Sequence, residues 1–260
     1  MFINYHLMIN QQNIFDENLI NIRKKRIINK FSSFLHSLAI DDLKERLVEI
    51  GDEFLETLVV GPFAKHWAHN ISQKKTSTID DNEFLKIIPS SKDLIISALH
   101  LHSVNDPISK LVQMRFGLKK TGIFMGYAFG EGSLLELRKS LEYAELKNFG
   151  GISPRVHPMI DTPTYGSLLS RSGFKFCVTD KLHFEIEYQD PWDLIIDLKS
   201  IGETNCLIKR SKRPLTKIFL NDVLNFYKNN FSSSKIHNKY IATFDIICLT
   251  GWNTKPKSVV

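Results

Sequence analysis

The stretch DLIISALHLHSVNDPISKLVQMRFGLKKTGIFMGYAFGEGSLLELRKSL, residues 93–141, alternates twice between a short apolar run and an amphipathic segment. Asp93–Leu99 and Ile123–Phe129 are each apolar enough to form a buried strand. The segments that follow them, 104–120 and 133–146, have helical periodicity. This strand–helix alternation predicts a mostly parallel sheet with helices on both faces.

The same alternation extends along the chain on either side of this stretch. The apolar run Leu58–Val60 stops at Gly61-Pro62, which is typical of a buried strand that ends in a turn. The apolar runs 174–179 and 183–188 are separated by a short turn at Asp180-Lys181, which predicts an antiparallel pair at the sheet edge. The other predicted elements are helices at 14–38, 164–173, 191–202 and 215–231, strands at 76–79 and 242–252, and a Gly- and Pro-rich loop at 148–166.

Length and composition are those of an ordinary globular protein. The 260 residues, 43% of them hydrophobic and 24% charged, suit one large α/β domain with an appendage or two small domains. The net charge of +6 is compatible with an anionic ligand or an acidic protein partner. It is too weak a bias to indicate a nucleic-acid-binding protein, and no known nucleic-acid module accompanies it.

The cysteines and the N-terminus predict the compartment. Cys177, Cys206 and Cys248 lie far apart and include no CxxC pair, so we expect neither a disulfide framework nor a zinc or other metal site. No apolar run reaches the roughly 18–20 residues that span a bilayer. The N-terminus lacks a basic region followed by an apolar one, so no secretory signal is expected. The predicted location is therefore cytoplasmic.

The segment Gly130-Glu131-Gly132 lies at a strand–helix junction, where α/β proteins often bind a phosphate. The dinucleotide fingerprint requires a third glycine, and Leu135 stands at that spacing. The carboxylate of Glu131 would also repel a phosphate. The segment is therefore predicted to be a turn or a helix N-terminus that borders the substrate cleft.

A basic block, Arg23-Lys24-Lys25-Arg26, lies in the predicted helix at 14–38. Such runs are most often a solvated helix face. The alternative is that these cations lie over the mouth of an active site or dock a partner. Sequence alone leaves both interpretations open.

Two histidines flank Leu101 after the strand at 93–99. Alternation places His100 and His102 on the same side of an extended chain, but no third ligand follows at a spacing typical of a metal site. His102 is therefore expected either to line a cleft or to be a hydrogen-bonded structural histidine. The three tryptophans, Trp67, Trp192 and Trp252, are expected in the core or in cleft walls.

Polar residues in the 148–166 loop and in the segment after Gly202 are the main candidates for ligand contacts. Loop residues have few packing reasons to be polar, so Arg155 and His157 are predicted to contact a substrate, although Arg155 can equally form a salt bridge to the domain. Cys206 is a conceivable nucleophile for which no base can be identified. A second cluster, which can also be a capped helix end followed by solvated charge, contains Glu203, Asn205, Arg210 and Arg213.

Several segments together resemble the S-adenosylmethionine-dependent methyltransferase superfamily. The resemblance is closest to the methyltransferase-like assembly factors of respiratory complex I and their alphaproteobacterial relatives, and more distant to the biotin-pathway malonyl-carrier-protein methyltransferases. It covers nearly the whole chain. Besides residues 93–141, it rests on IFDENLINIRKKR (14–26), GGISPRVHP (150–158), SLLSRSGF (167–174), IGETNCLIKRSKRPL (201–215) and YIATFDIICLTGW (240–252).

This resemblance implies a class I methyltransferase-like, doubly wound α/β fold, with a mostly parallel sheet, an antiparallel edge strand pair and helices on both faces. It implies an N-terminal helical cap at 1–45 and a methyltransferase-like domain at 46–260 with an inserted loop. S-adenosylmethionine is the implied cofactor, and a respiratory complex I subunit, modified at an arginine, is the implied partner. The implied cofactor-binding residues are Gly61, Asp80, Leu99 and His102, and the implied substrate-binding residues are Arg155, His157, Asn205 and Arg210.

The loop after the first strand departs from the acidic, Gly-rich pattern of the superfamily. Val59 stands where the acid is expected, and Phe63 and Lys65 occupy later glycine positions. Phe63 is expected to fill the space of the cofactor's methionine part, and Pro62 removes a backbone donor. Weak cofactor binding is therefore predicted. The sequence leaves open an S-adenosylmethionine-dependent enzyme acting on a protein, a non-catalytic scaffold, and a carboxyl methyltransferase for a carrier-bound acid.

Overall fold

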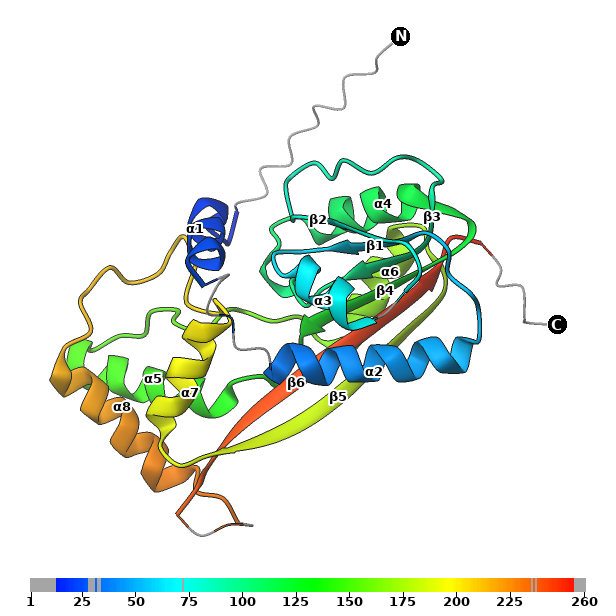
Figure 1. Cartoon of the computed structure of the whole chain (residues 1–260). Coiled ribbons are helices and arrows are strands. Elements are labelled where there is room, and N and C mark those ends of the chain that lie inside the picture. The colour runs from blue at the N-terminus through cyan, green and yellow to red at the C-terminus, as the bar shows by residue number, and fades with distance from the viewer. Residues whose placement is uncertain are drawn as a thin grey trace.

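The computed structural model describes residues 13–27, 31, 34–71, 73–234, 236 and 238–254. A single six-stranded sheet, with strand order β2-β1-β3-β4-β6-β5, runs through the molecule (Figure 1). Its strands are β1 (Thr57–Val60), β2 (Thr76–Ile79), β3 (Lys92–Ser97), β4 (Leu118–Phe129), β5 (Lys175–Tyr188) and β6 (Tyr240–Trp252).

The first four strands are parallel to one another, whereas β6 pairs antiparallel with both β4 and β5. Parallel strands require crossover connections, and helices supply them between β1 and β2 and between β3 and β4. The predicted fold class, a mostly parallel sheet with an antiparallel edge, is confirmed. The helices are α1 (Glu17–Ile27), α2 (Phe34–Ile50), α3 (Ala64–Ile71), η1 (Leu101–Ser103), α4 (Pro107–Gly117), α5 (Leu135–Phe149), α6 (Thr162–Arg171), α7 (Pro191–Ser200) and α8 (Lys217–Asn230).

The core forms on both faces of the sheet because successive strand residues point to opposite sides. Ile96 packs in the cluster that contains Leu43 of α2, while its neighbour Ile95 packs in the cluster that contains Leu168 of α6. Helices α5, α7 and α8 gather at one end of the molecule, beyond the end of β4 (Figure 1). This arrangement creates a space between the sheet and the helices, in which the candidate site lies.

The predicted hairpin at 174–188 is wrong. Residues Lys175–Tyr188 form one continuous strand, and Asp180-Lys181 pair with β6 in the middle of the ladder, opposite Cys248 and Ile247. Two polar residues do not end a strand at the edge of a sheet, because one of its faces remains in contact with water. The antiparallel partner of this segment is β6.

The single helix predicted at 14–38 is also wrong. Helix α1 ends at Ile27 and α2 begins at Phe34, and residues 28–30 and 32–33 of the predicted helix lie outside the described residues. Helix α3, which sequence reasoning missed, has only eight residues and buries Ala64, Trp67 and Ile71. The other predicted elements are found with shifts of a few residues at their ends.

The Gly130-Glu131-Gly132 segment is a turn that packs against β6. A Cβ atom on Gly130 would lie 2.8 Å from the Ile247 side chain, and one on Gly132 would collide with the carboxylate of Asp245. These glycines are therefore required by close backbone packing. The turn brings Ser133 and Leu134 to the wall of a cavity.

Candidate functional site

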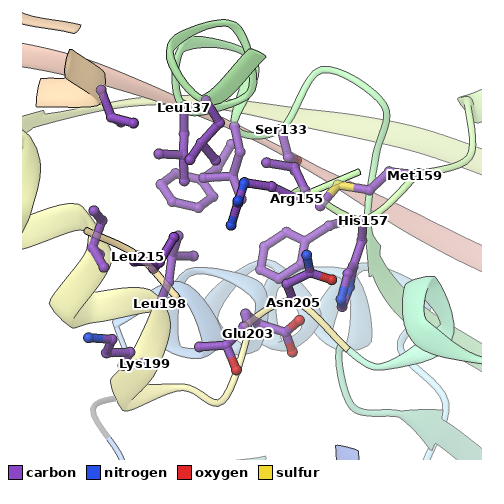
Figure 2. Close-up of a pocket in the computed structure, with 18 of the residues that line it drawn as sticks. Ser133, Leu137, Arg155, His157, Met159, Leu198, Lys199, Glu203, Asn205 and Leu215 are labelled. Atoms are coloured by element: carbon purple, nitrogen blue, oxygen red, sulfur yellow. The ribbon is translucent and has the colours of Figure 1, made fainter. Parts of the chain in front are cut away.

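A cavity of about 300 Å³ lies between the end of β4, the loop at 150–161 and helices α5, α7 and α8 (Figure 2). Its walls are mainly apolar, and eight polar side chains of the described residues also line it. Such a combination is typical of small-molecule and peptide sites. The apolar lining comprises Phe129, Leu134, Leu137, Leu141, Val156, Met159, Trp192, Ile195, Leu198, Leu215, Leu220, Val223 and Phe244; the polar lining comprises Arg23, Ser133, Arg155, His157, Lys199, Glu203, Thr204 and Asn205.

Three predicted substrate-binding residues, Arg155, His157 and Asn205, line this cavity together. Arg155 forms an ion pair with Glu145 of α5, and its guanidinium lies 4.7 Å from the centre of the Phe219 ring. The Asn205 amide donates to the carbonyl of Pro154 at 2.9 Å. These contacts hold the 150–161 loop against its neighbours, and they shape the cavity whether or not a ligand is bound.

His157 is a neutral side chain in this wall. Burial lowers its pKa to about 4, and its Nε2 accepts a hydrogen bond of 3.0 Å from the backbone N–H of Cys206. The ring proton must therefore be on Nδ1. The ring also packs edge-on against Phe15, with centroids 5.1 Å apart. His157 thus joins the N-terminal segment, the loop and the 203–207 segment.

A buried charge network closes one side of the cavity. Lys24 forms an ion pair with Glu203, and His102 lies 3.0 Å from the other carboxylate oxygen of Glu203. Burial alone would raise the pKa of Glu203, but the nearby Lys24 and His102 outweigh this effect and hold the pKa well below its usual range. Both oxygens of the Glu203 carboxylate are therefore engaged, and the group is ionised at neutral pH.

The basic block of α1 divides into two halves. Lys24 is buried against Glu203, and Arg23 lines the cavity and donates to the Thr204 hydroxyl at 2.6 Å and to the Asn205 carbonyl at 2.7 Å. Lys25 and Arg26 remain exposed. Arg23 therefore lines the candidate cavity, whereas Lys25 and Arg26 match the interpretation as a solvated helix face.

Other predicted site residues lie elsewhere. Arg210 does not line the cavity; it binds the carbonyl of Leu207 at 2.8 Å and lies 3.4 Å from a carboxylate oxygen of Asp16. Of the tryptophans, Trp67 is fully buried, whereas Trp192 lines the cavity. Sequence reasoning missed Lys199 and the apolar walls, since only the packing of α5, α7 and α8 brings them together.

The four predicted cofactor-binding residues do not share one pocket. Gly61 ends β1 in a buried position, and Leu99 is buried in the core. Asp80 is exposed at the rim of a separate cavity of about 530 Å³ beside β1 and β2. Strand β3 ends at Ser97, so the expected strand alternation does not reach His100 and His102.

The residues around Gly61 do not fit the methionine part of S-adenosylmethionine. The His100 ring lies beside Gly61, such that a Cβ atom there would be 3.0 Å from Nδ1. Phe63 is buried and stacks on Phe31 with ring centroids 4.0 Å apart. The cavity that Asp80 lines is also lined by Pro62 and Phe63 of this loop, whereas the side of Gly61 that faces His100 and Ala98 is filled.

The order and directions of the strands define a class I methyltransferase-like protein. A solved structure from Bacillus halodurans, provisionally described as a methyltransferase, superposes with a TM-score of 0.50 over 82% of this chain and 99% of that one, at 13% identity. At this identity the likeness concerns the fold. No family model matches the chain.

The chain belongs to the methyltransferase-like family that includes RP459 of Rickettsia prowazekii, a protein provisionally named a methyltransferase. The two are 33% identical over 155 residues, which cover 58% of this chain and 69% of RP459. The mitochondrial arginine-hydroxylase NDUFAF5 of Rattus norvegicus is 34% identical over 192 residues, covering 73% of this chain. The matched region spans only 55% of that relative's length. The resemblance found in the sequence is thereby confirmed.

Within the described segments, every helix is too short or too polar to span a bilayer.

Proposed function

We propose that this chain is a methyltransferase-like protein that acts by binding a protein partner, without transferring a methyl group. The observation that supports this proposal is the substituted loop after β1, in which Phe63 is buried and the His100 ring lies beside Gly61, where the superfamily has a glycine-rich loop for the cofactor. Methyl transfer depends chiefly on positioning of the donor. A chain that cannot seat the donor retains the fold and its surfaces, and these suffice for binding a partner.

The proposed partner is a subunit of respiratory complex I or its precursor. Support comes from the resemblance to methyltransferase-like assembly factors and from the relatives that carry the name arginine-hydroxylase. The chain spans about half the length of the rat relative, so what that whole protein does is carried to this chain only as a proposal. The cytoplasmic location expected from the sequence stays a prediction.

Arginine modification is the second candidate function. Glu203 lines the cavity, and a carboxylate there is a natural partner for a guanidinium. As the site stands, Lys24 and His102 engage both oxygens of Glu203. The arginine of a bound partner would therefore have to displace Lys24 from Glu203. This requirement makes arginine modification a weaker candidate than partner binding alone.

Calorimetry tests the proposal that the chain does not bind the methyl donor. Titration with S-adenosylmethionine is expected to give no heat of binding in the micromolar range. Asp80→Asn serves as the matched variant, because Asp80 is exposed and its loss leaves the core intact. Low-micromolar binding by the unaltered protein that Asp80→Asn weakens would overturn the proposal.

Co-purification from the cells that express the chain tests the proposed partner. A tagged full-length chain is expected to retain a complex I subunit, which mass spectrometry identifies together with the state of its arginines. A retained subunit with unmodified arginines supports the partner-binding function. A modified arginine on the retained subunit, unmodified on the same subunit in cells that lack the chain, would instead support the second candidate.

A further inference from the structure

A second hollow, of about 350 Å³, adjoins the apolar cavity between α1 and α7. Arg23, Lys199 and Thr204 line both spaces, so the two share a wall. The hollow is otherwise lined by Arg26, Ile27 and Gly202. It therefore contains three cations and no carboxylate.

Within the described residues, these cations have no carboxylate partner. Arg23 uses one terminal nitrogen for Thr204 and the Asn205 carbonyl, both of which are uncharged acceptors. Lys199 lies 5.4 Å from the centre of the Trp192 ring. Among the residues that the structure describes, no carboxylate forms an ion pair with Arg23, Arg26 or Lys199. The hollow is thus a cluster of free positive charge that favours an anion.

The adjoining cavity has the opposite character. Its walls come from the apolar faces of α5, α7 and α8, and Figure 2 shows Leu137, Leu198 and Leu215 around its interior. Its one carboxylate, Glu203, is already paired with Lys24. Hydrocarbon is favoured in such a space, because transfer of each methylene from water is favourable.

We propose that the two spaces together bind an amphipathic phosphate, with its hydrocarbon chain in the apolar cavity and its phosphate in the hollow lined by Arg23, Arg26 and Lys199. A phosphate monoester is favoured over a carboxylate because it carries nearly two charges at neutral pH and because arginine binds phosphate through paired hydrogen bonds. The inference goes beyond the proposed function: ligand uptake and partner binding can each be present without the other.

Calorimetry with octyl phosphate, used below its micelle concentration, tests this site. Octyl phosphate is expected to bind more tightly than octanoate, and both more tightly than octanol or inorganic phosphate. Each methylene added to the chain should tighten Kd about fourfold until the cavity is filled. Binding of octanol as tight as that of octyl phosphate, or no dependence on chain length, would overturn the proposal.

The variant Arg26→Gln/Lys199→Gln tests the head-group half. Both side chains are exposed, so the fold should be retained, and octyl phosphate binding is expected to weaken about tenfold. The matched control Lys25→Gln/Lys209→Gln removes the same charge from exposed positions that line neither space, and it should leave Kd unchanged. Equal weakening by both variants would show that net charge alone causes the effect, and this would contradict the proposed site.

Vesicle binding distinguishes a site for single octyl phosphate molecules from attraction of the chain to a membrane surface. The chain is expected to take up octyl phosphate while binding phosphatidylcholine vesicles equally poorly with and without phosphatidic acid. Binding to vesicles that contain phosphatidic acid, with no uptake of octyl phosphate, would replace the proposed site by a surface attraction to anionic membranes.

Discussion

The rings of Phe31 and Phe63 stack with centroids 4.0 Å apart and an interplanar angle of 18°. Phe63 follows the end of β1 by three residues, and Phe31 precedes α2. His36 and His66 add their rings around this pair. An aromatic cluster therefore surrounds Phe63, which stands where the loop pattern of the superfamily has a glycine.

We predict that Phe63→Ala destabilises the protein by about 3–5 kcal/mol, because it removes a buried aromatic ring and leaves a cavity against Phe31. Urea denaturation measures the change. Phe116→Ala, whose ring is 62% exposed on α4, is the control and should remain within about 0.5 kcal/mol of the unaltered protein. Equal losses in the two variants would show that Phe63 is not packed as described.

We predict that Glu203→Gln destabilises the protein by about 3–5 kcal/mol, because Lys24 would remain buried without its carboxylate. The double variant Lys24→Met/Glu203→Gln should recover part of this loss, since it removes the uncompensated charge. Both are measured by chemical denaturation. Glu53→Gln breaks an ion pair between exposed side chains, with Lys74, and should change stability little. A double variant less stable than Glu203→Gln would contradict the pairing.

We predict that stability falls as the pH drops from about 6.5 towards 4. Burial lowers the pKa of His100 and of His157 to about 4, below the usual value of about 6.5. The unfolded chain therefore binds more protons in this window. Each histidine contributes stability that is complete above pH 6.5 and decreases by about 2 kcal/mol by pH 5.

Denaturation midpoints between about pH 7.5 and pH 5 measure this dependence. In His157→Gln, whose amide oxygen can still accept the N–H of Cys206, the slope should become smaller. His69→Gln, an exposed position on α3, should leave the slope unchanged. A slope as steep in His157→Gln as in the unaltered protein would show that His157 does not contribute to the acid sensitivity. Glu203 adds a further loss only at lower pH, since its folded pKa lies well below the usual carboxyl value.

We predict that Gly132→Ala destabilises the protein by about 1–3 kcal/mol, because the added methyl group would collide with the Asp245 carboxylate on β6. Thermal or urea denaturation provides the measurement. Gly151→Ala is the matched control, since a Cβ atom there meets nothing within 4 Å. If Gly132→Ala were as stable as Gly151→Ala, the turn would not pack on β6 as described.

Most strands could be predicted from sequence because each is a local pattern. Leu94–Ile96 and Phe124–Phe129 are runs with no charged or strongly polar residue, and a buried parallel strand needs nothing further. Edge strand β5 was divided in two because Asp180 and Lys181 are polar. Their strand conformation is imposed by pairing with Cys248 and Ile247, about 70 residues away, which no local pattern reports.

The candidate site was only partly predictable for the same reason. Arg155, His157 and Asn205 were selected as polar residues of a loop and of a polar cluster, and the fold brings them to one cavity. The pairing of Lys24 with Glu203 was not predictable, because 179 positions separate the two residues in the sequence. The basic block of α1 has the same local sequence whether its lysines face water or a buried carboxylate.

The sequence by itself determined the alternation of strands and helices along most of the chain, the family and the substituted glycine loop, because each of these is encoded in runs of neighbouring residues. Only the tertiary structure decided that Phe63 stacks on Phe31, that the His100 ring lies beside Gly61, and that free cations adjoin an apolar cavity. Those features depend on contacts between segments that are far apart in the sequence. Such contacts form only when the sheet and its helices pack together.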